Sequence, residues 1–89
     1  MDNYRRMEGV AKGFANHRRI RILFLLEKEP GLSVEEVAEA LDGRFETIAA
    51  HLRRLTIAGL VMKRSEGRSV RHRISDRARS VLRFLEALK

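Results

Sequence analysis

Apolar residues recur at helical spacing through most of this chain and alternate with polar residues in one short region near its end. The stretch from Ser33 to Leu60 predicts two amphipathic helices. The first has its apolar face at Val34, Val37, Ala38 and Leu41. The second has a stripe formed by Ile48, Leu52 and Leu55. Asp42 and Gly43 lie between them, and we expect Gly43 to adopt the positive φ of a sharp turn.

Residues flanking these two helices have the chemistry of helix ends. Ser33 is expected to be the N-cap of the first helix, and Glu36, three residues later, would complete a capping box. Gly59 follows the second helix where a left-handed cap would end it. Two helices joined by a short turn that contains Gly form a helix-turn-helix, which we therefore place at residues 33–60.

After Gly59 the period changes from helical to alternating. Residues 61–65 and 69–74 predict two strands, and the segment Ser65-Glu66-Gly67-Arg68 between them predicts a hairpin turn with Gly at a position of positive φ. One face of this ribbon, residues 60–74, is expected to be apolar and to pack on the helical core. The other face is basic, which is typical of a wing that meets phosphates.

Three further helices are expected. One covers residues 2–15, a second begins after an N-cap at Asn16 and is apolar on most of its circumference, and a third follows the cap Ser75-Asp76. The predicted fold is therefore mainly α with a small β-hairpin, an α+β winged helix-turn-helix of order α-α-α-α-β-β-α. With 89 residues, the chain is expected to be one domain, residues 1–89.

The first and last helices each carry an apolar stripe without an evident partner. We expect residues 1–15 and 76–89 to form a dimer interface, since twofold symmetry is the commonest oligomeric arrangement. The alternative is that both stripes close the core of a monomer. The candidate dimerisation residues are Tyr4, Met7, Phe14, Val81, Phe84, Leu85 and Leu88.

The charge is strongly positive and unevenly distributed. The chain has 19 Lys and Arg against 12 Asp and Glu, a net charge of +7 and a pI of about 11.0. Residues 44–73 contain eight basic and two acidic residues, so +6 of this charge lies there. Such an excess favours nucleic acid or an anionic membrane as partner. A solvated face that is merely rich in Arg is the alternative.

Several segments together resemble the ArsR-type winged-helix transcriptional regulators. The resemblance rests on the order of the predicted elements and on the segments at residues 13–23, 37–41, 47–55, 58–61 and 66–68. It covers nearly the whole chain. It implies a homodimeric bacterial or archaeal repressor that binds a palindromic operator and is released by a metal ion or another signal.

The chain departs from that family at the positions where members commonly bind metals. It has no Cys, and the last predicted helix has no His. His17, His51 and His72 lie on separate elements without the spacing of metal ligands. The resemblance places His51 near the DNA backbone, and His72 is expected on the inward face of the wing. We therefore expect no metal and no cofactor.

The second helix of the helix-turn-helix is expected to enter the major groove of DNA. Glu46 could accept from cytosine, or could simply be favoured by the helix dipole; Phe45 could pack on the preceding helix or on a base methyl. The family often has a polar or basic side chain where this chain has Ala50. The candidate recognition residues are Arg44, Phe45, Glu46, Thr47, Ala50, His51, Arg53 and Arg54, and the candidate wing residues are Lys63, Arg64, Arg68 and Arg71.

The sequence thus predicts a sequence-specific regulator that binds double-stranded DNA as a homodimer. A winged-helix module that binds proteins, a non-specific DNA binder or an RNA binder is the alternative. No constellation of residues meets the requirements of an enzyme. Without an apolar segment able to serve as a signal peptide or to cross a bilayer, the protein is expected in the cytoplasm. The resemblance implies a prokaryotic cell, with association with the nucleoid when the protein binds DNA.

Overall fold

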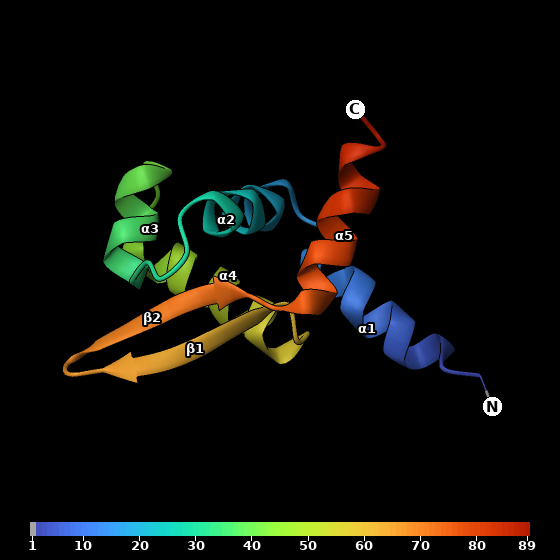
Figure 1. Ribbon diagram of the computed structural model, residues 1–89, viewed down its shortest axis with the longest axis horizontal. Coiled ribbons are helices and arrows are strands. Elements are labelled where there is room, and N and C mark those ends of the chain that lie inside the picture. Colours follow the sequence, from blue (N-terminus) through green and yellow to red (C-terminus); the bar gives the residue numbers. More distant parts are fainter. Residues whose placement is uncertain (1) are drawn as a thin grey trace.

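The computed structural model describes residues 2–89, which form five helices and one hairpin in the predicted order (Figure 1). Met1, part of the segment 1–15 that was expected at the dimer interface, lies outside the described residues. The elements are α1 (Tyr4–Phe14), α2 (His17–Lys28), α3 (Val34–Ala40), α4 (Phe45–Ile57), β1 (Val61–Glu66), β2 (Ser69–Ile74) and α5 (Asp76–Glu86). Over the described residues, no helix has both the length and the apolar character needed to cross a membrane.

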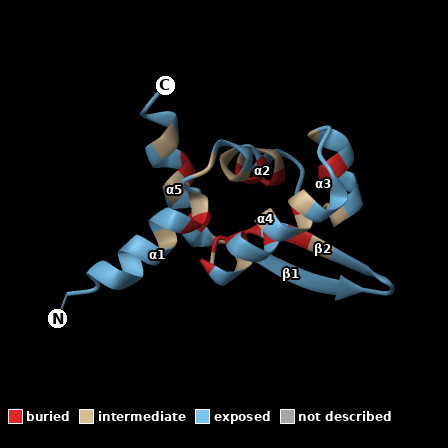
Figure 2. Ribbon diagram, turned by 180° about the vertical axis from the view of Figure 1, so that it is seen from behind, coloured by how far each residue is buried: buried red, intermediate tan, exposed pale blue. Residues whose placement is uncertain are grey.

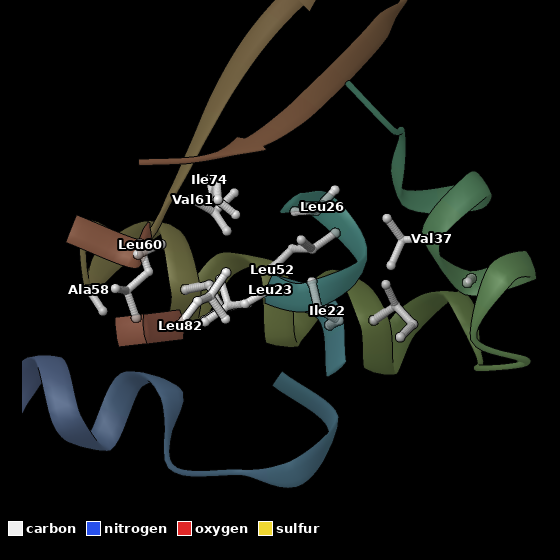
Figure 3. Close-up of a cluster of buried hydrophobic side chains, with 14 residues drawn as sticks. Ile22, Leu23, Leu26, Val37, Leu52, Ala58, Leu60, Val61, Ile74 and Leu82 are labelled. Carbon is white, nitrogen blue, oxygen red and sulfur yellow. The ribbon is translucent and has the colours of Figure 1, made fainter. Parts of the chain in front are cut away.

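The core lies where α2, α3, α4, α5 and the base of the hairpin meet (Figure 3). Helix α2 is central to it, since Ile22, Leu23 and Leu26 are all fully buried. Helix α4 contributes its predicted stripe of Ile48, Leu52 and Leu55. Figure 2 shows that most of α1 and the outer part of the hairpin are exposed. The core therefore fixes α4 on one side and leaves its other side accessible.

The three predicted N-caps are present. Asn16 Oδ1 accepts hydrogen bonds from the amides of Arg18 and Arg19 at 2.9 and 3.1 Å. Ser33 and Glu36 form a reciprocal capping box, and the Ser33 amide bonded to the Glu36 carboxylate lowers the pKa of that carboxyl group. Ser75 Oγ accepts from the amide of residue 78 at 3.2 Å. These helix starts were encoded locally, so the pattern of the sequence predicted them.

The turn between α3 and α4 differs from the expectation. Asp42 takes the left-handed conformation, with φ of 52°, whereas Gly43 does not have a positive φ. Space is the constraint at Gly43, because an added Cβ would lie 3.0 Å from two side-chain carbons of Ile48. An Asp tolerates the left-handed region better than most residues. The predicted positive φ is correct at Gly59 and Gly67, with values of 74° and 62°.

The hairpin has an antiparallel register that pairs Val61 with Ile74 at its base and Glu66 with Ser69 at its tip. The prediction that one whole face packs on the core was wrong. Val61, His72 and Ile74 are buried, but Val70 farther along the same face is 39% exposed. The hairpin extends beyond the helices, so only its base has a core to pack on (Figure 1).

Candidate nucleic-acid interface

Helix α4 has one solvent-accessible face, and its opposite side packs on the hydrophobic core. Its outward positions Glu46, Ala50 and Arg53 are exposed, as the helical pattern predicted, and Ile57 at its end is 76% exposed. Thr47 and His51, on one flank, are partly buried. Because the opposite side of the helix is held by the core, its accessible face has a fixed orientation relative to the rest of the chain.

The start of α4 is also accessible. Arg44 occupies the N-cap position but makes no side-chain hydrogen bond to the first turn of the helix. Phe45 is 48% exposed, so the rest of the chain does not fully cover its ring. The accessible surface of α4 thus extends from the turn at Asp42 to Arg54 near its end.

The wing carries its basic side chains on both faces and at its tip. The register places Lys63 opposite His72 on one face and Arg64 opposite Arg71 on the other. Lys63, Arg64 and Arg68 are exposed. A hollow of about 200 Å³ separates the wing from α4, with Lys63 and Val70 on the side of the wing and Arg53 on the side of the helix. The wing and the outward face of α4 therefore border a common surface.

Arg71 is placed differently from the other basic residues of the wing. Its Nε donates to Glu66 Oε1 at 2.8 Å, and its Nη1 donates to the carbonyl oxygen of Gly31 at 2.9 Å. Gly31 precedes α3 and has a φ of 91°. Sequence reasoning assigned Arg71 to DNA alone and missed this contact, which joins residues 40 positions apart. Arg71 also ties the wing to the loop before α3.

His72 supplies a second tie at the base of the wing. Its side chain is 2% exposed, as the expected inward orientation requires. Its ring Nδ1 lies 2.9 Å from the carbonyl oxygen of Leu32, which also accepts from the His72 amide at 2.9 Å. Gly31 donates in turn to the His72 carbonyl at 2.8 Å. These bonds make residues 31–32 a short third partner of the hairpin.

A second basic cluster flanks α4 on the side away from the wing. His17, Arg18 and Arg19 begin α2, and their charges, after burial itself, lower the pKa of His51 on α4. Burial and the nearby Arg54 lower the pKa of Arg19, whose Nε is buried without a hydrogen-bond partner. Sequence reasoning did not assign Arg18, Arg19 or Arg21 to the interface. The basic run His-Arg-Arg-Ile-Arg at residues 17–21 is the feature of the sequence that could have indicated this cluster.

The terminal helices divide the candidate dimerisation residues into two groups. Phe14, Val81 and Leu85 are partly buried and pack against the core. The other four are largely exposed, at 57% to 68%: Tyr4, Met7, Phe84 and Leu88. Helices α1 and α5 lie at the same end of the molecule (Figure 1). Part of each stripe therefore closes the core, and part remains uncovered in the single chain.

The described residues offer no ready-made metal site. Within residues 2–89, no three side chains of His, Asp or Glu gather closely enough to hold an ion. His17, His51 and His72 lie on α2, α4 and β2 respectively, as the sequence indicated. The polar chemistry of the accessible surface is that of Arg and Lys side chains, which suits phosphate groups.

A helix-turn-helix followed by a two-stranded wing defines the winged helix-turn-helix class, and solved structures share this arrangement. One is the homodimeric winged helix-turn-helix DNA-binding domain of a possible ArsR-family transcriptional regulator from Mycobacterium bovis, with 33% identity, a TM-score of 0.82 and coverage of 96% of this chain and 78% of that one. HlyU from Vibrio cholerae has 30% identity, a TM-score of 0.84 and coverage of 98% and 95%.

NolR from Sinorhizobium fredii supports the fold alone, with 24% identity, a TM-score of 0.87 and coverage of 96% and 85%. No curated protein matches the sequence. The model of the ArsR family of bacterial regulatory proteins matches residues 16–63, and the chain belongs to this family. The predicted family and winged helix-turn-helix fold are confirmed. The family and fold are those of DNA-binding transcriptional regulators, so the prediction that the chain is not an enzyme is also confirmed.

Proposed function

We propose that this protein binds double-stranded DNA as a homodimer, with sequence preference, and represses transcription. The observation that carries the proposal is the common surface formed by the outward face of α4 and the basic wing. Helix α4 would enter the major groove, and Lys63, Arg64 and Arg68 would neutralise phosphates or enter the minor groove. The homodimeric state of the similar domain from Mycobacterium bovis supports a twofold arrangement.

The exposed apolar residues of α1 and α5 supply the dimer interface in this proposal. Tyr4, Met7, Phe84 and Leu88 would become buried against a second copy, while Phe14, Val81 and Leu85 would connect that interface to the core. A dimer would present two α4 helices to a palindromic site, because operator symmetry mirrors protein symmetry. The chain has no Cys, so release from DNA would depend on a signal other than cysteine chemistry.

Recognition of base sequence would rest on few side chains. Glu46 and Thr47 lie on the accessible side of the first turn of α4, with Arg53 a further candidate. Ala50, at the centre of the exposed face, can contact a thymine methyl but cannot form the bidentate hydrogen bonds that distinguish guanine or adenine. Phosphate contacts from the wing and from His51 and Arg54 would then dominate affinity, and specificity would depend partly on DNA shape.

Selection from random duplexes followed by binding measurements at several salt concentrations tests this function. We expect a palindromic preferred site. Arg68→Ala should weaken binding to all duplexes and reduce the salt dependence by about one unit for each wing that contacts a phosphate. Glu46→Ala and Thr47→Ala should instead change the preference among sequences.

Arg83→Ala is the matched control, since it removes one exposed charge from the last turn of α5. It should leave the salt dependence as in the wild type. A wild-type protein that binds no duplex, or an Arg68→Ala variant with unchanged salt dependence, would contradict the DNA-binding role or the role of the wing, respectively.

A further inference from the structure

A hollow of about 260 Å³ lies beside the start of α4, between α2 and the turn that connects α3 to α4. Its polar lining consists of Arg18 and Arg21 from α2, Asp42 from the turn, and Arg44 and Thr47 from the start of α4. The two arginines of α2 are three positions apart, so they lie on the same face of that helix.

This hollow lies on the opposite flank of α4 from the wing. Ala49 and Arg53 border the space next to the wing, whereas Thr47 and Ile48 border the hollow. At 100° per residue, Ala49 and Thr47 are about 200° apart around the helix. The exposed position Ala50 lies between these two flanks on the outward side. Helix α4 is therefore flanked by basic residues on both sides of its accessible face.

The fold does not neutralise the charge of the hollow. Across residues 2–89, none of Arg18, Arg21 and Arg44 forms an ion pair, and the single carboxylate of the lining, Asp42, leaves an excess of positive charge. All three arginines are exposed. Arginine suits phosphate because its planar guanidinium can donate two parallel hydrogen bonds. A phosphate group is thus the complement of this lining.

A helix in the major groove has a phosphate backbone on each side of it, because the groove is bounded by the two DNA strands. In the function proposed above, the wing contacts one of these backbones, and only His51 and Arg54 of α4 itself were assigned to phosphates on the other side. We propose that Arg18, Arg21 and Arg44 bind the other backbone, so that a phosphate occupies the hollow beside α4. This inference rests on the proposed DNA binding, and it moves Arg44 from the set of base-reading residues to the set of phosphate-binding residues.

Removal of the Asp42 carboxylate tests the proposed phosphate site by an increase in DNA affinity, whereas removal of an arginine should decrease it. It faces the same hollow and would repel a bound phosphate. Asn also tolerates the left-handed backbone that residue 42 adopts, so Asp42→Asn removes the charge without a change of conformation. We expect this variant to bind duplex DNA more tightly than the wild type, an effect that loss of structure does not produce.

The decisive experiment measures duplex binding by fluorescence anisotropy as a function of salt concentration. Arg18→Ala combined with Arg21→Ala should make the salt slope shallower by about one unit for each protomer, which is about two for a dimer. The double Lys variant at the same positions should retain most of the slope, because it keeps the charges. Arg79→Ala combined with Arg83→Ala, which removes two charges from α5, should behave as the wild type.

Melting temperature and sedimentation of each variant establish that fold and assembly are retained. If Arg68→Ala reduces the slope but the Arg18 and Arg21 double Ala variant does not, the second phosphate site is wrong and the proposed function stands. If the wild type binds no duplex, both the proposed function and the second phosphate site are wrong.

Discussion

The two parts of the proposed interface are built in different ways. Helix α4 lies directly on the core, with three of its side chains almost fully buried. The wing has buried residues only at its base, and its position depends on the bonds that His72 and Arg71 make with residues 31–32. The helix is thus oriented by packing, whereas the wing is oriented by a few hydrogen bonds. Substitutions of the buried side chains of α4 should therefore lower the free energy of unfolding strongly. Substitutions in the outer part of the wing should change it little.

The largest expected difference compares Leu55 on α4 with Val70 on the wing. Leu55→Ala should lower the free energy of unfolding by about 2–5 kcal/mol, because it leaves a cavity in the core around a fully buried side chain. Val70→Ala should change it by less than about 0.5 kcal/mol, since that side chain is 39% exposed. Urea denaturation measures both. Equal losses would mean that the wing is part of the cooperative core.

Two glycines in α1 test how the end of α4 is held. An added Cβ at Gly13 would overlap the Cβ of Ala58, which directly follows α4, whereas an added Cβ at Gly9 meets nothing within 4 Å. Gly13→Ala should cost about 1–3 kcal/mol through overpacking. Gly9→Ala should stabilise by about 0.5–1 kcal/mol, because Ala favours the helix. Thermal unfolding distinguishes them. A stabilising Gly13→Ala would show that α1 does not pack closely on this end of α4.

The next prediction concerns the N-cap of α3, the helix that packs against α4 on the side opposite α1. Ser33→Ala should lower the free energy of unfolding by about 1 kcal/mol, because the amide of Glu36 loses its acceptor. Ser65→Ala, on the exposed wing, is the control and should have an effect within about 0.5 kcal/mol. If the two variants are equally stable, the capping box does not contribute to the folded state.

The smallest effect concerns His51. Its pKa is lowered from the ordinary value of 6.5 by burial and by Arg19, Arg18 and His17. The unfolded chain therefore binds more protons between the two pKa values, so the free energy of unfolding should fall as the pH decreases through 6.5. Denaturation at about pH 7.5 and about pH 5.5 checks this. The loss should be smaller in His51→Gln, and an identical loss would exclude His51 as its source.

The sequence predicted the features that depend on near neighbours along the chain. Asn16, Ser33 and Ser75 cap helices as expected, and Gly59 and Gly67 have positive φ, because each depends on residues only a few positions away. The apolar stripe of α4 was predicted for the same reason. Periodicity therefore sufficed for the order of the elements and for the accessible face of α4.

The sequence did not predict the features that depend on contacts between distant segments. The bond of Arg71 to Gly31 spans 40 positions, and the hollow that unites Arg18 and Arg21 with Arg44 exists only once α2 lies beside α4. The packing of the wing was overestimated at Val70, because alternation gives the face of a residue but not how far the core extends beneath it. At the turn, Ile48 leaves little space for a side chain at Gly43.

The exposed length of the hairpin has one more consequence, for self-association. A projecting strand with unpaired amide and carbonyl groups along its edge is a template for pairing with another chain. Residues 31–32 cover part of the outer edge of β2, whereas β1 pairs only with β2 in the described chain. Lys63 and Arg64 lie along β1, and like charges on two such edges repel each other. The positive charge proposed to bind DNA should thereby also disfavour sheet-like aggregation of the wing.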